Sequence, residues 1–227
     1  MKVELVEYTP NAEALCAAAM KLCHVPDKDS FMDMYRSFLS GHYADAESKI
    51  KEFISLALKL GHESVLEHAS FTFYVEGVSR ALTHQLVRHR IASYSQQSQR
   101  HVDISEPSFV IPESFSGKKI VSNLRADGVV EGLMKNIWDV YSELIKSGVP
   151  LEDARFVLPN ACTTKIVITM NARELRHFFK LRCSKHAQWE IREMACRMLK
   201  LCNDVAPIIF RDLYMSYEEY PVTLEEK

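Results

Sequence analysis

The spacing of apolar residues predicts two amphipathic helices. In residues 45–61, DAESKIKEFISLALKLG, one face carries Ile50, Phe53, Ile54, Ala57 and Leu58. Gly61 is a typical C-terminal stop for that helix. In residues 127–148 the same steps of three and four place Val130, Leu133, Ile137, Val140 and Leu144 on one face.

Other stretches have the composition of strands. SFTFYVEG at 70–77 and TTKIVITM at 163–170 are rich in aromatic and β-branched residues, and 2–8 and 100–111 are weaker candidates. Helices are predicted at 78–90, 172–182 and 187–203, followed by a polar tail, and a loop is predicted around Pro107, Pro112 and Gly117. Strands and helices do not alternate regularly, so the pattern favours an α+β fold. Without repeats or linkers, residues 1–227 are expected to form a single domain.

The composition is that of a globular protein, with 47% hydrophobic and 26% charged residues. A net charge of −2 argues against a protein wholly devoted to nucleic acid, although a local basic patch is possible. No apolar run approaches the roughly 18 residues of a membrane span, and the N-terminus does not resemble a signal peptide. The six cysteines form no CxxC pair, which is typical of reduced thiols in a cytosolic protein. We therefore expect a cytoplasmic protein without membrane or nucleic-acid partners.

The most unusual segment runs from Gly77 to Val102, where 26 consecutive residues include no Asp or Glu. Positive charge in it comes only from arginine, at positions 80, 88, 90 and 100. Arginine meets phosphate or carboxylate with a planar fork, which lysine lacks. The neighbouring residues Ser93 to Gln99 add neutral donors and acceptors.

These residue types suit a nucleotide, because arginines can hold phosphates while amides and hydroxyls contact base and sugar. An Asp or Glu nearby would pair with the arginines and compete with the nucleotide. This explains why the segment from Gly77 to Val102 contains no acid. The residues alone leave open a solvated basic helix end. Ser98 lacks a nucleophile elbow, so we expect it to form hydrogen bonds and not to act as a nucleophile.

Several ordered blocks carry a resemblance to a known family. RHRIASYSQQS at 88–98 resembles the signature of the flavin-dependent thymidylate synthases, Arg-His-Arg followed by seven residues and a serine. The segments GHESVLEH at 61–68, ARFVLP at 154–159, MNARELRHFFKLR at 170–182 and HAQWEIR at 186–192 resemble the family's other blocks in the same order. The chain also lacks a glycine-rich phosphate loop, so side chains would have to hold the phosphates of a dinucleotide.

The resemblance implies an activity and an assembly. It implies reductive methylation of dUMP to dTMP, with 5,10-methylenetetrahydrofolate as one-carbon donor, NADPH as reductant and bound FAD as hydride carrier. It also implies a mainly antiparallel sheet packed by helices, in a homotetramer whose subunits share active sites. Two other classes stay open: an RNA-binding module that uses the arginine segment, and a flavin oxidoreductase of unrelated substrate.

The resemblance also implies site residues. FAD would contact His62, Ser64, Glu67, Arg88, His89, Arg90, Gln96, Asn171, Arg173 and His177, with His186 as a weaker candidate. Substrate dUMP would contact Gln85, Leu86, Val87, Arg88, Gln96, Gln97, Ser98, Gln99, Arg100, Arg155 and Arg182. Arg182 would be the catalytic residue, since a fixed cation beside the uracil ring favours ionisation at N3.

The chain departs from the family's pattern in three places, one of which covers two residues. Ser95-Gln96 stands where many members have Asn-Glu, His101 replaces a frequent Tyr, and His177 sits where some relatives carry Asn. Gln96 can donate and accept hydrogen bonds but cannot act as a base. A metal site is not expected, because neither His62 with His68 nor His84 with His89 has a third ligand at a suitable spacing.

Overall fold

The computed structural model describes residues 1–24, 30–40, 45–104, 108–120 and 123–217. The strands are β1 (Lys2–Tyr8), β2 (Ser70–Ser79), β3 (Ala92–Gln96), β4 (Lys119–Ile120), β5 (Leu124–Arg125) and β6 (Thr163–Asn171). The α-helices are α1 (Ala12–His24), α2 (Phe31–Leu39), α3 (Ala46–Leu60), α4 (Arg80–Leu86), α5 (Ala126–Lys146), α6 (Leu151–Ala154), α7 (Ala172–Arg182), α8 (Trp189–Val205) and α9 (Pro207–Tyr217). Short 3-10 helices are η1 (Glu63–His68), η2 (Glu113–Phe115) and η4 (Arg155–Val157).

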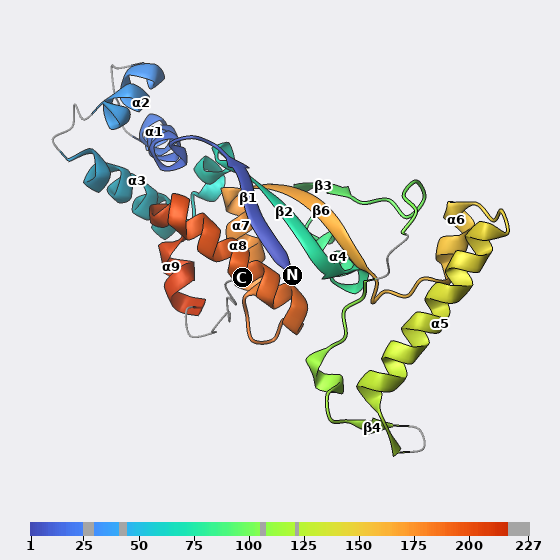
Figure 1. Cartoon of the computed structure of the whole chain (residues 1–227). Helices are drawn as coiled ribbons and strands as arrows, with labels where there is room; N and C mark the ends of the chain where they lie inside the picture. The colour runs from blue at the N-terminus through green and yellow to red at the C-terminus, as the bar shows by residue number, and fades with distance from the viewer. Residues whose placement is uncertain (25–29, 41–44, 105–107, 121–122, 218–227) are drawn as a thin grey trace. The chain divides into compact units, whose positions relative to one another are not determined.

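The main sheet has the strand order β1-β2-β6-β3 (Figure 1). Its pairing is mainly antiparallel. The end of β1 meets the start of β2, where the Thr9 N–H donates to the Ser70 carbonyl at 2.9 Å. The hydroxyls of Thr72 and Thr169 lie 3.0 Å apart, which joins the start of β2 to the end of β6. The predicted α+β class is therefore confirmed.

The chain divides into two compact units, and β2, β3 and β6 each contribute residues to both. Unit 1 comprises Met1–Lys2, Val75–Arg88 and Ser95–Ile166. Unit 2 comprises Val3–Tyr74, His89–Tyr94 and Val167–Lys227. The single domain expected over residues 1–227 stays a prediction.

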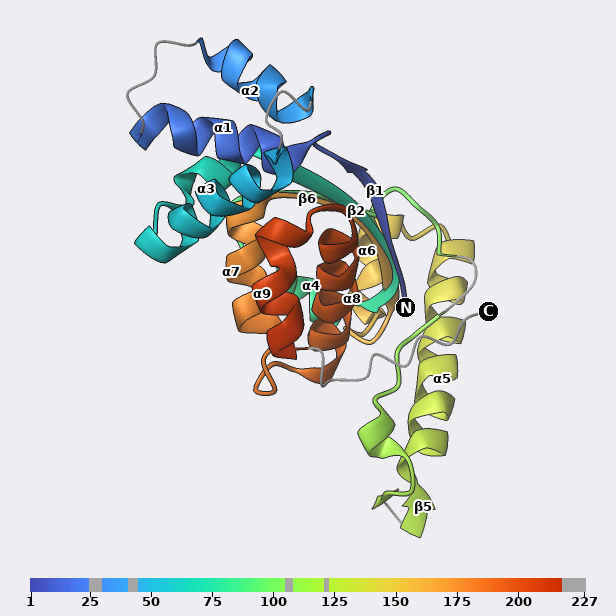
Figure 2. The same cartoon turned by 90° about the vertical axis from the view of Figure 1, so that its left-hand side faces the viewer.

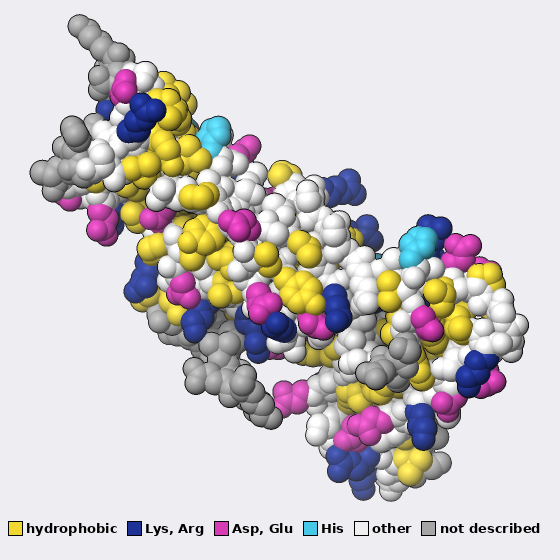
Figure 3. All heavy atoms as spheres, turned by 45° about the horizontal axis from the view of Figure 1, so that its top comes forward, with side chains coloured by type: hydrophobic (Ala, Val, Ile, Leu, Met, Phe, Trp, Pro, Cys, Tyr) yellow, Lys and Arg dark blue, Asp and Glu magenta, His cyan; other side chains and the backbone are white. Residues whose placement is uncertain are grey.

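Unit 2 contains an aromatic core between its strands and its C-terminal helices. The Phe71 ring of β2 packs edge-on against the Phe210 ring of α9, with centroids 5.5 Å apart. The Phe179 ring of α7 also contacts Phe210, with centroids 5.9 Å apart. Helices α7, α8 and α9 lie side by side, and α1 packs against α2, α3 and η1 (Figure 2). On the surface of α1 and α2, apolar side chains gather, including Leu22, Met32 and Leu39 (Figure 3).

The long helix α5 of unit 1 confirms the helix predicted at 127–148. Leu133 and Val140 are 52% and 51% exposed, whereas Met134 and Tyr141 are buried. The other members of the predicted stripe, Val130, Ile137 and Leu144, are half-buried. The rings of Trp138 and Tyr141 lie 5.0 Å apart.

Two predicted boundaries near the arginine segment were wrong. Strand β2 does not stop at Gly77, which adopts φ 73° inside the strand, and continues to Ser79. The helix predicted over 78–90 covers only Arg80–Leu86, so Arg88 lies beyond its end. Residues Ala92–Gln96, for which no strand was predicted, form β3, in which half-buried and exposed residues alternate.

The remaining predictions have mixed outcomes. Strands 2–8 and 163–170 and helices 45–61, 172–182 and 187–203 are confirmed within one or two residues. The described part of 100–111 is not a strand, apart from a single bridge between Phe109 and Cys162, and 105–107 lie outside the described residues. The polar tail was partly wrong, because Pro207–Tyr217 form α9 and bury Ile209, Phe210 and Leu213.

Two further findings concern features expected from composition. All six cysteines are free thiols. Among the helices that the structure describes, none has the length and apolar character needed to cross a membrane.

Candidate functional site

Two helices that carry predicted site residues begin directly where sheet strands end. In unit 1, β2 ends at Ser79, whose hydroxyl accepts a 3.0 Å hydrogen bond from the Leu82 N–H at the start of α4. In unit 2, β6 ends at Asn171, whose side-chain oxygen accepts a 2.9 Å bond from the Glu174 N–H in α7. Such N-caps stabilise a helix by satisfying amides that lack intrahelical partners. Each strand therefore fixes the start of a functional helix.

In unit 2, His89 lies against the face of α7. Its Nε2 accepts a 3.0 Å hydrogen bond from the Arg182 Nε–H, and its Nδ1 lies 3.3 Å from a carboxylate oxygen of Glu174. Between these contacts the Phe178 ring meets the imidazole edge-on, with centroids 4.9 Å apart. The Tyr94 hydroxyl donates a 2.8 Å bond to the His89 carbonyl.

The surroundings of His89 favour the neutral form of its imidazole. Its side chain is almost fully buried, and burial together with the nearby Arg182 and His177 lowers its pKa from 6.5 to about 4. Burial also raises the pKa of the Glu174 carboxyl, against a smaller lowering by His177. A cationic His89 beside the Arg182 guanidinium would be repelled, so the neutral form matches this environment.

A cavity of about 430 Å³ opens beside α7 in unit 2. It is lined by Glu63, Glu67, Ile91, Asn171, Arg173, Glu174, His177 and Lys180. Four of these, Glu67, Asn171, Arg173 and His177, are among the residues predicted to contact FAD. The volume lies within the range of roughly 300–1,000 Å³ that is typical of ligand sites.

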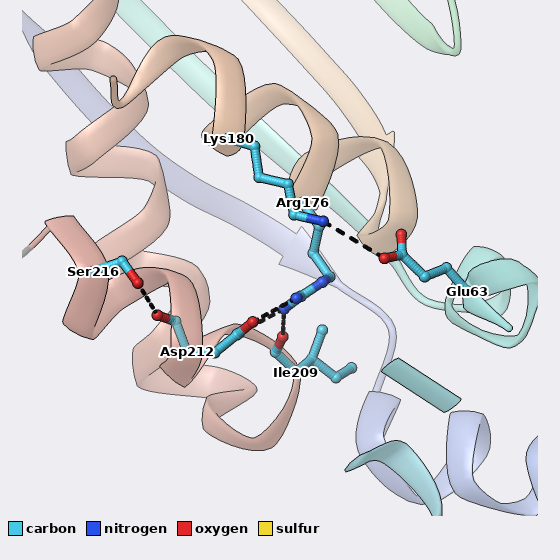
Figure 4. Close-up of polar contacts among 6 residues, drawn as sticks. All are labelled: Glu63, Arg176, Lys180, Ile209, Asp212 and Ser216. Carbon is cyan, nitrogen blue, oxygen red and sulfur yellow. Dashed lines mark hydrogen bonds and ion pairs between the residues drawn. The ribbon is translucent and has the colours of Figure 1, made fainter. Parts of the chain in front are cut away.

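The cations that line this cavity are already balanced by acids. The Arg173 guanidinium forms an ion pair with Glu67, and the Lys180 Nζ lies 3.6 Å from a Glu63 oxygen (Figure 4). Arg90, which belongs to the same unit, is exposed and forms no ion pair with any residue that the structure describes. Uncompensated positive charge for a phosphate is therefore found at Arg90 and not at Arg173 or Lys180.

In unit 1, the predicted dUMP residues are organised around two polar groups. The Gln96 amide donates to the hydroxyls of Thr83 and Thr164 at 3.2 and 3.3 Å. The Ser98 hydroxyl accepts a 3.1 Å bond from the Arg100 N–H. No His, Lys or acid among the described residues bonds the Ser98 hydroxyl, which fits a hydrogen-bonding role.

Two of the arginines predicted to contact dUMP bind to Glu152 instead. The Arg100 Nε lies 3.2 Å from the Glu152 carboxylate, and the Arg155 Nε–H donates to the Glu152 carbonyl at 3.0 Å. The absence of acids along 77–102 therefore does not leave every arginine without an acidic partner. Arg88 is exposed and has no ion pair within the described parts of the chain.

Arg80 is a further arginine of unit 1 that the family resemblance did not assign. Its Nη1 is buried and has no hydrogen-bond partner in the described structure. Burial and the nearby Arg155 lower the pKa of the Arg80 guanidinium. The two cations are therefore close enough to interact within this unit.

The structure places the other predicted residues as follows. Gln85 is half-buried at the end of α4, Leu86 is buried, and Val87 is exposed. Because the Leu86 side chain lies in the core, only its backbone could meet a ligand. His62 and Ser64 are exposed at the start of η1, and Gln97 and His186 are exposed. Within the described ranges, no group of three His, Cys, Asp or Glu side chains is arranged to hold a metal ion.

Comparison with known proteins decides the family. Residues 4–208 match the family model described as thymidylate synthase complementing protein. The chain belongs to this family. It is 51% identical over 214 residues to a flavin-dependent thymidylate synthase of Geobacter sulfurreducens, covering 93% of this chain and 86% of that protein. It is 43% identical over 230 residues to the Clostridium tetani protein of the same name, with the same coverage. A Saccharolobus solfataricus protein of that name is 40% identical over 238 residues, covering 100% of this chain and 85% of the relative.

The segment that matches the thymidylate synthase complementing protein model contains every predicted site residue. The structure gathers several of them beside α7 in unit 2 and others around Gln96, Ser98 and Glu152 in unit 1. Their assignment to FAD and to dUMP stays a prediction.

Sequence reasoning missed residues that the structure brings into these groups. Glu174, Glu63 and Lys180 were given no role, although they line the cavity. One signal was present: Glu174 and Arg182 lie eight residues apart with Phe178 midway, which places all three on one helical face. The contact of that face with His89 is long-range, and no local pattern predicts it.

Proposed function

We propose that this protein is a flavin-dependent thymidylate synthase, which converts dUMP to dTMP by reductive methylation. The observation that carries the proposal is its identity of 40–51% to relatives of that name over most of both chains. The co-substrate is 5,10-methylenetetrahydrofolate, the reductant is NADPH, and FAD is the cofactor.

The residues present fit a flavin dinucleotide. The cavity beside α7 offers Asn171 and His177 as hydrogen-bonding groups, and the exposed Arg90 offers a guanidinium without an acidic partner among the described residues. We assign FAD contacts to these residues and to His62, Ser64, Glu67, Arg88, His89, Gln96 and Arg173. FAD supplies hydride transfer, a chemistry that no protein side chain provides.

The chain's own residues bind and polarise dUMP. We assign the nucleotide to Gln85, Leu86, Val87, Arg88, Gln96, Gln97, Ser98, Gln99, Arg100, Arg155 and Arg182. Arginines hold the phosphate by bidentate hydrogen bonds, and Arg100 must exchange part of its contact with Glu152 to do so. Both Arg100 and Glu152 are half-exposed, so water screens their ion pair and the exchange costs little.

Arg182 is the proposed catalytic residue. Its guanidinium stabilises negative charge that develops on the uracil ring, which favours ionisation at N3. Its Nε–H is engaged by His89. Its two Nη groups donate no hydrogen bond to any described residue, so they are the groups that face the substrate.

We further propose a homotetramer with active sites shared between subunits, in the cytoplasm, without nucleic-acid or membrane partners. One cavity of about 430 Å³ in one chain provides only some of the proposed FAD contacts, which supports the sharing of sites between chains. Six free thiols fit a reducing compartment.

Complementation tests this function in cells. The gene should restore growth without thymidine to a bacterium that lacks thymidylate synthase, and Arg182→Ala should not. The purified protein should be yellow and reducible by NADPH. An RNA-binding module would be colourless and would bind RNA with steep salt dependence, and an unrelated flavin oxidoreductase would be yellow but would not restore growth.

A further inference from the structure

Three residues at four-residue spacing, Glu174, Phe178 and Arg182, form one face of α7, and His89 contacts all of them. Two helical turns, about 12 Å of axial rise, separate the first from the last. The imidazole bridges this distance because Glu174 reaches it at Nδ1 and Arg182 reaches it at Nε2, at 3.3 and 3.0 Å. The face therefore connects a buried acid to the proposed catalytic arginine through one histidine.

The chemistry of the donors fixes the position of the ring proton. The Arg182 Nε–H can only donate, so His89 Nε2 must carry a lone pair. The single proton of the neutral ring is then on Nδ1, which lies 3.3 Å from a carboxylate oxygen of Glu174. The opposite tautomer would set two N–H groups against each other at Nε2.

Orientation of the guanidinium follows from this bond. A bond from the Nε edge of Arg182 to His89 restricts the orientations that its planar fork can adopt. Arg182 forms no ion pair and no second hydrogen bond with any described residue, so His89 is the group that holds it. A displacement of about 1 Å in such a group can reduce a rate by roughly 10²-fold.

We propose that Glu174 is a positioning residue for dTMP synthesis, which keeps His89 in the Nδ1–H tautomer so that His89 directs the Nη groups of Arg182 toward the substrate. This role rests on the proposed function, because it acts through Arg182. The competing explanation is that Glu174 only stabilises α7, since an acid in the first turn of a helix is favourable there.

The tautomer can be measured without any activity. Nitrogen-15 NMR of the protein labelled at histidine distinguishes Nδ1–H from Nε2–H, and His89→Asn assigns the signal. The expected spectrum of the wild-type protein shows His89 neutral with the proton on Nδ1 at pH 7. A proton on Nε2 would overturn the proposal, whether or not any Glu174 variant folds.

Two variants then test the consequence for catalysis. Glu174→Gln keeps an oxygen that can accept from Nδ1–H, but its amide can also turn and favour the wrong tautomer. Glu174→Leu has similar size and no acceptor. The expected kcat for dTMP falls in the order wild type, Gln, Leu, with a loss of about tenfold to 10²-fold for Leu. NADPH reduction of bound flavin without dUMP should stay within about twofold.

Asp212→Asn is the matched control. Asp212 also binds a side chain of α7, through two hydrogen bonds of 2.7 and 2.6 Å to Arg176 on another face of the helix (Figure 4). This variant should lower the thermal midpoint and leave the kcat for dTMP unchanged. Equal loss of flavin reduction and dTMP formation in Glu174→Leu, or an unchanged kcat in that variant, would refute the positioning role. If the wild-type protein forms no dTMP, the proposed function fails, and the tautomer measurement still decides the geometry.

Discussion

The Nε–H of Arg182 donates a 3.0 Å hydrogen bond to Nε2 of His89, although 93 residues separate them in the chain. The contact joins the middle of the Arg-His-Arg segment to the last residue of α7. Both residues lie in unit 2. The bond gives Arg182 a hydrogen-bond partner, and the positive charge of Arg182 lowers the pKa of His89.

Replacing Arg182 by Ala should separate substrate activation from flavin chemistry. We expect dTMP formation to fall about 10²–10³-fold, the usual cost of losing a group that stabilises developing charge. Reduction of bound flavin by NADPH without dUMP should continue. Stopped-flow absorbance measures the second quantity and product analysis the first. Arg211→Ala, an exposed arginine of α9 in the same unit, is the control and should change neither. Equal loss of both activities in Arg182→Ala would make Arg182 a cofactor or folding residue.

Arg90→Lys should weaken FAD binding while preserving charge. Arg90 is exposed and has no acidic partner among the described residues, and a single ammonium cannot reproduce a bidentate contact with phosphate. We expect the Kd for FAD, measured by flavin fluorescence on reconstitution, to rise about tenfold. Arg36→Lys, at an exposed site in α2, should leave it unchanged. An unaltered Kd in Arg90→Lys would remove this residue from the proposed FAD site.

Ser98→Ala should reduce affinity for dUMP and retain turnover. The Ser98 hydroxyl accepts from the Arg100 N–H, and no described side chain is placed to remove its proton. Losing a hydrogen bond of this kind costs about 0.5–1.5 kcal/mol, which is roughly tenfold, and we expect it in the KM for dUMP. Loss of a true catalytic serine costs on the order of 10⁶ in kcat in the subtilisin case. Complete loss of turnover in a flavin-loaded variant, or nucleotide trapped on Ser98, would contradict the binding role.

The lowered pKa of His89 predicts a pH dependence of stability. In the unfolded chain the imidazole takes up a proton near pH 6.5, whereas in the fold it does so only near pH 4. The stability that neutral His89 contributes is therefore present above pH 6.5 and is lost as the pH falls toward 4. His89→Gln lacks this titration. We expect the free energy of unfolding of the wild-type protein, from urea titrations, to fall more steeply than that of His89→Gln between pH 6.5 and pH 4.

The raised pKa of Glu174 acts in the opposite direction over part of this range, but the acid is present in both proteins. The comparison of the two slopes therefore isolates His89. Parallel slopes would show that His89 is not held neutral by the fold.

Helices with a clear local signal could be predicted from the sequence. Helix α3 follows the spacing from Ile50 to Leu58 and ends at Gly61, which has φ 72°. Helix α1 was missed because residues from Ala14 to Lys21 are buried on nearly all sides, so polar and apolar positions do not alternate. The full burial of Met134 and Tyr141 in α5 could not be predicted, because periodicity gives the apolar stripe but not its partner.

Of the candidate site, the sequence could predict the local motifs but not the contacts between them. The Arg-His-Arg segment and the block around Arg182 are visible in the sequence, but the bond between His89 and Arg182 depends on tertiary packing. The pairing of Arg100 with Glu152, across 52 residues, was unpredictable for the same reason. A segment that contains no acids can still be contacted by an acid from another part of the chain.

Formation of dTMP by the purified protein tests the central claim most directly. The protein is incubated with FAD, dUMP, 5,10-methylenetetrahydrofolate and NADPH, and the product is identified by mass spectrometry, with each component omitted in turn. We predict dTMP only when all four are present, and its strong reduction in Arg182→Ala. A flavin-loaded, folded protein that oxidises NADPH but forms no dTMP from the complete mixture would contradict the account.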